Sequence, residues 1–391
     1  MSRSRIAFVA GTSAPQQIGG AEAVLREMAE GFAHRGWDVD LLSTAATSIY
    51  TWENTLPEGT TTEGPLTVRR FNAVGLTQPL RDRLGARILG GDRLELAEQY
   101  AWVNSGMRSP GLFDYLADHA GDYRAIVCGP YQFWMALVLA DLAPERTILM
   151  PCLHDEPFAG LEVYRYQMTS ARGLWLLSEP ERELAARHGL LGRRVAVIGS
   201  GIESPPPVDP DGFRVSHRLD RDFALFCGRR EWGKGWPQLL EDLRFATEVL
   251  GEPVPLVTCG VGDIGAVPAG AEVIDLGVVT PATRASAQAA ATVYIQPSAM
   301  ESFSRTVLES FSLGTPVIAN DASAVVRWHC ERSGAGLTYR NRYEFAESLR
   351  LIRSDPDALA QLGAAGPAYV AEHFAWPAVL DRAVATIEEW L

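Results

Sequence analysis

Short hydrophobic runs rich in β-branched residues alternate along this chain with longer segments whose apolar residues recur at helical spacing. The pattern begins with a run at 5–11 (RIAFVAG), a helical segment at 21–36 and a second run at 37–44. Such alternation is typical of βαβ units built around a parallel sheet. A second series of short runs follows at 223–228 (FALFCG), 254–260, 272–277, 292–298 and 315–321.

A segment rich in proline and charge, 202–222 (IESPPPVDPDGFRVSHRLDRD), separates the two series and is interpreted as an interdomain linker. The length of 391 residues exceeds what one ordinary core supports. We therefore predict an α/β fold of two Rossmann-like, doubly wound domains that face a central cleft.

Composition narrows the function. Hydrophobic and charged fractions of 47% and 21% are those of a globular protein, and the formal charge of −13 argues against a general binder of nucleic acid or of anionic membranes. The most apolar run, 133–140, ends at Asp141 and is too short to span a bilayer. The five cysteines show no metal-type spacing. We expect reduced thiols, a cytoplasmic location and no transmembrane segment.

Candidate chemistry follows the predicted strands, whose carboxyl ends are where ligands bind in open parallel sheets. In the second series, Arg229 and Lys234 follow the first strand, Gly262 follows the next, and Glu301 follows the strand at 292–298. In the first series, Gly19 and Gly20 follow the first strand, and His154 follows the run at 147–153.

The stretch at 300–320 places Glu301 and Glu309 around a patch that is otherwise predicted to be buried. Its spacing predicts a helix that Gly314 and Pro316 end, with Glu301 on the preceding loop and Glu309 about a turn inside. The free N–H groups of Phe303, Ser304 and Arg305 would then form a phosphate site, since a helix N-terminus binds anions. Carboxylates accept hydrogen bonds strongly from hydroxyls, so a nucleotide sugar fits this arrangement. The alternative is that both glutamates are ordinary helix charges.

Two apparent motifs are rejected. The stretch 228–234 nearly matches the phosphate loop of NTPases, but Gly235 stands where Ser or Thr is needed for magnesium. Glycines 260, 262 and 265 match a dinucleotide fingerprint, yet the next strand begins too soon for a crossover helix.

Together, four segments resemble the GT-B nucleotide-sugar-dependent glycosyltransferases, specifically the retaining family 4 (glycosyl transferases group 1), over nearly the whole chain. These segments are IGGAEAVLREMAEGFAHRGWDVDLLST (18–44), GRREWGKG (228–235), ESFSRTVLESFSLGTPVIA (301–319) and HFAW (373–376). The resemblance implies an acceptor-binding domain at 1–203, a nucleotide-sugar-binding domain at 204–368, and a terminal helix at 369–391 that crosses back to the first domain.

The resemblance also implies roles for individual residues. Arg229 and Lys234 would hold the donor diphosphate, with Gly19 and Gly20 closing over it. Glu309 would bind the ribose, Glu301 the donor sugar and Val279 the nucleobase. His154 would lie under the sugar near the anomeric carbon, unless it is an ordinary core histidine. The sequence departs from the family at Ser304, where glycine is common, and after Asp321, where a glycine pair is missing.

The expected reaction transfers a hexosyl group to a hydroxyl acceptor with retention. Front-face attack is favoured because no second carboxylate is suited to act as the nucleophile. No metal or other cofactor is expected to be required. Two alternatives stay open: a GT-B epimerase or phosphorylase, and a non-catalytic sugar-nucleotide-binding protein. The donor base, its sugar and the acceptor are also open.

An arginine-rich segment at 68–93 bears on the acceptor. It is interpreted either as a solvated surface or as an attractor of an acidic acceptor, such as a phosphorylated or lipid-linked intermediate. Its arginines are Arg69, Arg70, Arg81, Arg83, Arg87 and Arg93.

Overall fold

The computed structural model describes residues 4–13, 20–48, 51–75 and 77–391. The chain forms two compact units, each built on its own sheet. The first unit comprises Met1–Gly201 with Val379–Leu391, and the second comprises Ile202–Ala378. We predicted boundaries at 203 and 368, so the second unit extends ten residues beyond the predicted end.

Within the described residues, the first unit holds an eight-stranded sheet in the order β3-β4-β2-β1-β5-β6-β7-β8. Only the pairing of β3 with β4 is antiparallel. The strands are β1 (Arg5–Val9), β2 (Asp38–Thr44), β3 (Gly59–Glu63), β4 (Leu66–Phe71), β5 (Ala125–Cys128), β6 (Thr147–Leu149), β7 (Gly173–Leu176) and β8 (Val195–Val197).

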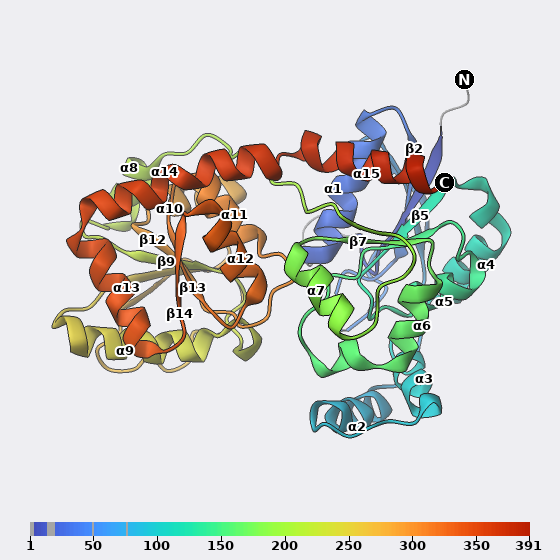
Figure 1. Cartoon of the computed structure of the whole chain (residues 1–391), viewed down its shortest axis with the longest axis horizontal. Coiled ribbons are helices and arrows are strands. Elements are labelled where there is room, and N and C mark those ends of the chain that lie inside the picture. Colours follow the sequence, from blue (N-terminus) through green and yellow to red (C-terminus); the bar gives the residue numbers. More distant parts are fainter. Residues whose placement is uncertain (1–3, 14–19, 49–50, 76) are drawn as a thin grey trace. The chain divides into compact units, whose positions relative to one another are not determined.

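The helices of this unit pack on both faces of the sheet (Figure 1). The ring of Phe32, on α1, packs edge-on against Phe8 of β1. The helices are α1 (Gly20–His34), α2 (Gln78–Leu89), α3 (Leu96–Asn104), α4 (Pro110–His119), α5 (Trp134–Leu142), α6 (Glu162–Ser170), α7 (Glu179–Arg187) and α15 (Trp376–Trp390), with short 3₁₀ turns η1 (Ala120–Asp122) and η2 (Pro157–Gly160).

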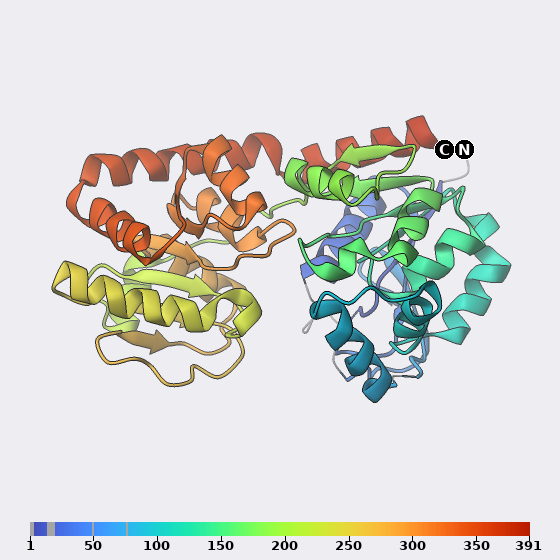
Figure 2. The same cartoon turned by 60° about the horizontal axis from the view of Figure 1, so that its bottom comes forward.

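The last helix of the chain, α15, packs on the first unit although it follows the second in sequence (Figure 2). Two glycines make room for it. A Cβ atom at Gly31 would lie 2.5 Å from Leu380, and one at Gly173 would lie 2.2 Å from the ring of Trp390. These close contacts fix α15 against α1 and β7.

The part of the second unit that the structure describes holds a six-stranded parallel sheet in the order β11-β10-β9-β12-β13-β14. Helices α9 and α13 lie on one face, and α10, α11 and α12 lie on the other (Figure 1). The strands are β9 (Ala224–Cys227), β10 (Leu256–Cys259), β11 (Val273–Asp275), β12 (Val293–Gln296), β13 (Val317–Asn320) and β14 (Gly336–Tyr339). The helices are α8 (Pro210–His217), η3 (Trp232–Lys234), α9 (Trp236–Leu250), α10 (Pro281–Ala290), α11 (Arg305–Ser312), α12 (Ala324–Ser333), α13 (Arg342–Ser354) and α14 (Pro356–His373).

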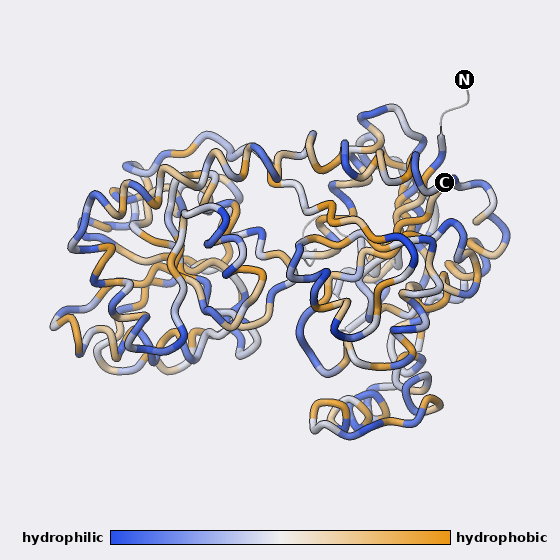
Figure 3. Tube along the Cα trace, in the orientation of Figure 1, coloured by the Kyte–Doolittle hydropathy of each residue, from blue (hydrophilic) through white to orange (hydrophobic). Residues whose placement is uncertain are grey.

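The hydrophobic runs identified in the sequence form the strands at the centre of each unit (Figure 3). The predicted α/β fold with two doubly wound parallel sheets is confirmed. One prediction needs correction, because the segment 202–222 is not wholly a linker. It contains α8, whose first turn is capped by a hydrogen bond from the N–H of Gly212 to the side chain of Asp209.

Two negative expectations also have structural outcomes. Every residue between β10 and β11 is described, and none of them is helical, which agrees with the rejected dinucleotide fingerprint. Among the described helices, none is both long and apolar enough to cross a membrane.

Candidate active site

The strand order of the second unit reverses at β9, which pairs with both β10 and β12. At such a switch point, the loops after the two central strands separate and leave room for a ligand. The loop after β9 carries Arg229 and Lys234, and the loop after β12 carries Glu301. The residues selected from the sequence therefore lie at the position where this topology binds ligands.

Close backbone contact fixes the loop after β9. Gly235 follows η3 with a φ of +71°, and a Cβ atom there would lie 2.6 Å from the carbonyl oxygen of Pro297, just after β12. The hydroxyl of Ser298 donates to the carbonyl of Gly233 at 3.3 Å. Only glycine fits such a left-handed turn beside another backbone. The loops after β9 and β12 are thereby held together.

This arrangement brings a cation and a carboxylate into contact. The Nζ atom of Lys234 lies 2.7 Å from Oε1 of Glu301, and the two side chains are 28% and 9% exposed. Lys234 is the only lysine among the 35 basic residues, the others being arginines. Arg229 extends from the same loop and lies 3.1 Å from Glu231.

Helix α11 begins at Arg305, one residue after a strained position. Ser304 is the N-cap residue and adopts a left-handed conformation with a φ of 63°. The side-chain amide of Gln296 donates to its hydroxyl at 2.6 Å, and both residues are buried. The need for a left-handed residue explains why glycine suits this position. The ring of Phe303 is buried against Phe374, so only its main chain is available for the predicted phosphate contact.

Glu309 lies inside α11, as predicted, and contacts a residue that the sequence did not single out. Arg284, on α10, places Nη2 3.4 Å from Oε2 of Glu309. That carboxylate oxygen is buried and has no hydrogen-bond partner among the described residues. It is therefore suited to accept a hydrogen bond from a ligand hydroxyl. Arg284 could not be found from sequence because it is one charge on an amphipathic helix.

Gly262 lies in the turn after β10 with a φ of +102°, and a Cβ atom there would lie 2.9 Å from the carbonyl oxygen of Arg230. Arg230 is almost buried, donates to the carbonyl of Gly262 at 2.9 Å and pairs with Asp275 at 3.1 Å. Arg230 thus ties three neighbouring strand ends together. Val279 is half-buried in the segment before α10, and its neighbour Val278 is 75% exposed.

The first unit carries three of the predicted residues, and the structure describes two of them. Gly20 is the exposed first residue of α1, whereas Gly19 lies outside the described residues. His154 lies in the loop after β6, with a side chain 40% exposed and Nδ1 4.0 Å from Oε1 of Glu156. It is not a fully buried core histidine.

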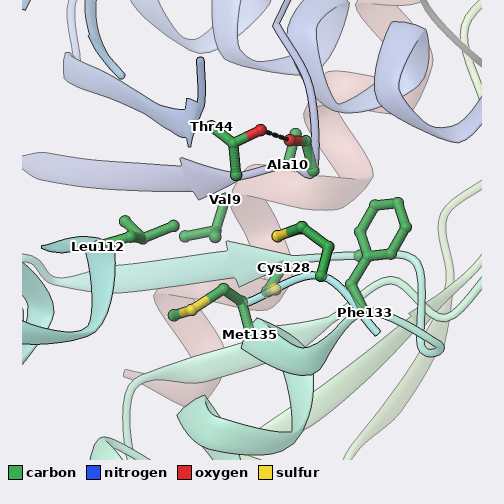
Figure 4. Close-up of a pocket in the computed structure, with 10 residues that line it drawn as sticks. Val9, Ala10, Thr44, Leu112, Cys128, Phe133 and Met135 are labelled. Carbon is green, nitrogen blue, oxygen red and sulfur yellow. Dashed lines mark hydrogen bonds between the residues drawn. The ribbon is translucent and has the colours of Figure 1, made fainter. Parts of the chain in front are cut away.

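An apolar pocket of about 10 Å³ lies in the first unit where β1 and β5 end (Figure 4). It is bounded by Val9, Cys128 and Phe133, while Thr44 donates to the carbonyl of Gly11 at 2.6 Å. A volume of roughly this size holds no more than about one water molecule. The pocket is too small for a substrate group.

The arginine-rich segment is largely neutralised. Arg81 lies over the ring of Trp102 at 4.5 Å and donates to its carbonyl, so it is not available to an acceptor. Four further arginines pair with carboxylates: Arg69 with Asp40, Arg70 with Glu63, Arg87 with Asp92 and Glu98, and Arg93 with Glu162. The interpretation of this segment as an attractor of acidic acceptors is therefore not supported by the structure.

Part of the chain is similar in sequence to known glycosyltransferases. Residues 210–368, most of the second unit, match the family described as "Glycosyl transferases group 1". A D-inositol 3-phosphate glycosyltransferase from Acidothermus cellulolyticus is 26% identical over 352 residues, which cover 81% of this chain and 75% of that protein. The corresponding protein from Streptomyces bingchenggensis is 36% identical over 97 residues, only 25% of this chain and 20% of the relative.

Solved structures extend the likeness to the whole fold. Sucrose-phosphate synthase from Thermosynechococcus elongatus aligns with a TM-score of 0.74 and 19% identity over 99% of each chain. HepE from Anabaena, solved with UDP and glucose, aligns with a TM-score of 0.70 and 17% identity over 99% of this chain and 100% of that one. A structure described as trehalose-6-phosphate from E. coli bound with UDP-2-fluoro glucose aligns with a TM-score of 0.71 and 13% identity over 98% of this chain and 99% of that one. The GT-B fold is confirmed.

Proposed function

Residues 210–368 match the glycosyl transferases group 1, and from this premise we propose that the protein is a retaining glycosyltransferase. It transfers a hexosyl group from a nucleotide-diphospho-sugar to a hydroxyl acceptor in the cytoplasm. The observation that carries the proposal is the contact of 2.7 Å between Lys234 and Glu301. It brings the residue proposed to bind the diphosphate next to the residue proposed to bind the sugar, at the switch point of the second sheet.

The donor is held by groups of the second unit. Arg229, Lys234 and the first turn of α11 bind the diphosphate, since cations and a helix N-terminus both favour phosphate. The buried oxygen of Glu309 accepts from a ribose hydroxyl, and Val279 lies against the base. Solved neighbours that contain UDP or a UDP-sugar make UDP the first nucleotide to test.

Lys234 and Glu301 change partners when the donor binds. The ammonium group turns to a diphosphate oxygen, which releases the carboxylate of Glu301 to accept from hydroxyls of the sugar. The pair is partly buried, with side chains 28% and 9% exposed, so breaking it without replacement would leave both charges poorly solvated. The charge-assisted contacts to the diphosphate and to the sugar hydroxyls offset that loss.

During transfer, the bond between the anomeric carbon and the diphosphate oxygen breaks, and negative charge develops on the leaving group. The acceptor oxygen bonds to the same face of the sugar, and its proton passes to a leaving-phosphate oxygen. Arg229 and Lys234 stabilise that charge where it develops, which is usually the largest catalytic term. Because these cations supply the charge, we propose that no metal is needed. His154 contacts the sugar near the anomeric carbon.

The acceptor is recognised through its hydroxyl group. The two curated relatives are named as acting on D-inositol 3-phosphate, which makes a phosphorylated cyclitol a suitable first acceptor to assay. The pairing of Arg69, Arg70, Arg87 and Arg93 with carboxylates gives no reason to place its phosphate in segment 68–93.

The single lysine makes donor binding directly testable. An amine-acylating reagent has one lysine target, Lys234, besides the terminal amine. We expect one of UDP-, GDP-, ADP- or dTDP-glucose to slow acylation of Lys234, measured by peptide mass spectrometry. The same ligand at about 100 times its dissociation constant should add about 2.7 kcal/mol to stability in a thermal-shift assay. Equal labelling of Lys234 with every nucleotide would remove the diphosphate assignment.

A release assay separates the proposal from its alternatives. A glycosyltransferase releases nucleotide from the protecting donor only when an acceptor is added, with turnover unchanged by EDTA. An epimerase converts the sugar without acceptor, a phosphorylase needs phosphate, and a binding protein releases nothing. Any of these three results would replace the proposed reaction.

A further inference from the structure

A buried carboxylate in the first unit, Glu181, has no part in the proposed reaction. It lies in the first turn of α7 and is 1% exposed. Ser178 and Glu181 form a Ser-x-x-Glu pattern, which usually indicates a capping box in which the glutamate accepts from the N-cap N–H. Ser178 does its share, since its hydroxyl accepts from the N–H of Glu181 at 3.2 Å.

The carboxylate itself contacts a different part of the chain. Its Oε2 accepts from the N–H of Leu177 at 2.5 Å, and its Oε1 accepts from the N–H of Leu153 at 2.7 Å. The N–H of Cys152 also donates to it. Cys152 and Leu153 follow β6, whereas Leu177 follows β7. Glu181 therefore ties the ends of two strands together beyond the last rung of their ladder at Leu149 and Leu174.

The segment that Glu181 holds is strained. Cys152 adopts a left-handed conformation with a φ of 54°. For a residue other than glycine, this conformation costs about 1–2 kcal/mol. It turns successive N–H groups toward one anion, an arrangement that binds anions elsewhere in proteins. The carboxylate offsets the strain by accepting hydrogen bonds from the N–H groups of Cys152 and Leu153.

His154 follows this segment directly. On its other side, its carbonyl accepts from the N–H of Glu156 at 2.9 Å, which closes a tight turn. The backbone of His154 is thus fixed between the two N–H groups bound by Glu181 and this turn. We infer that Glu181 is a positioning residue that holds His154 in place for sugar transfer, an inference that rests on the role of His154 in the proposed function.

The alternative is a purely structural role in capping α7. Capping alone would not require a charged group, because burying a carboxylate is costly and Ser178 already caps the helix. Nor would capping require acceptance from Leu153, which belongs to another element. Both facts indicate that Glu181 stabilises the loop that contains His154.

The test compares Glu181→Gln with Glu183→Gln, an exposed glutamate on the same helix. In E181Q, the side-chain NH₂ group faces a backbone N–H and cannot accept a hydrogen bond from it. The loop therefore loses one of the hydrogen bonds that hold it in place. A misplacement of about 1 Å can cost about 100-fold in rate, so we expect kcat to fall by that order with the donor KM little changed. E183Q should behave as wild type.

A double-mutant cycle with His154→Ala separates positioning from general stability. If Glu181 acts through His154, E181Q causes no further loss of kcat in the H154A background. Additive losses, or wild-type kcat in E181Q, would overturn the inference. Should E181Q not fold, Glu181→Asp takes its place, because the shorter carboxylate cannot reach both strand ends.

The ring resonances of His154, assigned with H154A, provide a readout that needs no substrate. A shift in E181Q that E183Q does not show supports the inference, and an unmoved signal contradicts it. If H154A itself keeps full turnover, the catalytic role given to His154 is wrong, and positioning is judged from this spectrum alone.

Discussion

At the scale of single residues, the clearest feature of the candidate site is that the single lysine of the chain, which has 34 arginines, lies 2.7 Å from Glu301. A lysine ammonium is a compact point charge with three donors, whereas an arginine guanidinium is a planar fork. In the proposed function, the compact form suits the position next to Glu301, because the same group turns from a carboxylate to a phosphate.

Replacing this lysine should therefore abolish most activity without affecting the fold. We expect Lys234→Ala to lower turnover at least about 100-fold, because it removes charge stabilisation from the leaving diphosphate. The control is Arg244→Ala, which removes a partly exposed cation of α9 that pairs, within the part of the chain that the structure describes, with Glu241 and Glu248. Near-normal turnover in K234A, measured as nucleotide release, would refute the assignment.

Ser304 allows a second prediction at this scale, on stability. In Ser304→Ala, the left-handed backbone remains and the buried amide of Gln296 loses its acceptor, at a cost of about 1–3 kcal/mol. Ser304→Gly loses the same hydrogen bond but relieves about 1–2 kcal/mol of backbone strain. We expect S304A to be less stable than S304G by about that amount in chemical denaturation.

The control for this pair lies at the other end of α11. Ser312 donates to the carbonyl of Glu309 within its own helix, so Ser312→Ala should be nearly neutral. If S304A and S304G proved equally stable, the strain at Ser304 would not be the reason that glycine suits this position.

At the scale of elements, α11 is held in place by α14 through glycines. A Cβ atom at Gly366 would lie 2.6 Å from the carbonyl oxygen of Phe311, and one at Gly363 would lie 2.6 Å from that of Gly314. Any side chain at these two positions would force α14 away from α11. Such a shift is costly, because protein interiors are densely packed. The position of Glu309 therefore depends on a helix that contributes no residue to the site.

Gly366→Ala should move α11 and weaken donor binding. Helix propensity alone would raise the free energy of unfolding of the variant by up to about 1 kcal/mol. The new methyl group, however, must displace the backbone of α11. We expect a net loss of stability and a higher dissociation constant for the nucleotide that protects Lys234, measured by calorimetry. Gly111→Ala in α4, where the nearest atom is 3.5 Å away, is the matched control and should not destabilise. Unchanged affinity in G366A would show that α14 does not fix Glu309.

At the scale of the whole molecule, one buried titratable group in each unit responds to pH with opposite sign. Burial raises the pKa of Glu181 in the first unit from 4.5 to about 7, against the opposing effect of its N–H donors. Burial lowers the pKa of His329 in the second unit from 6.5 to about 3. The ring of His329 contacts Phe303 and Tyr369 behind α11.

The signs follow from proton linkage. A raised carboxyl pKa contributes stability at low pH that is lost as pH rises from about 4.5 through 7. A lowered imidazole pKa contributes stability above pH 6.5 that is lost as pH falls toward 3. Each contribution changes by about 1.4 kcal/mol per pH unit within its window.

We therefore expect acidification from about pH 7 to 5 to stabilise the first unit through Glu181 and to destabilise the second through His329, each by about 2 kcal/mol. Hydrogen exchange resolved by peptide gives the two stabilities separately. Glu181→Gln should remove the response in the first unit only, and His329→Gln that in the second only. A response that survives its own variant would assign it to other groups.

Local pattern alone determined much of this protein. Strands such as β1, β9 and β12 could be predicted because short apolar runs bury both faces of a parallel sheet. The candidate residues Arg229, Lys234 and Glu301 followed from the rule that ligands lie beyond the carboxyl ends of such strands. Neither step needs any knowledge of distant contacts.

The tertiary structure alone decided which of these residues meet. Lys234 and Glu301 are 67 positions apart, and Leu153 and Glu181 are 28 apart. Nor could the sequence show that Arg284 faces Glu309, or that most arginines of 68–93 are already paired or stacked. Periodicity records which face of an element is buried, whereas the partner on that face depends on how distant elements pack together, and no local pattern contains that information.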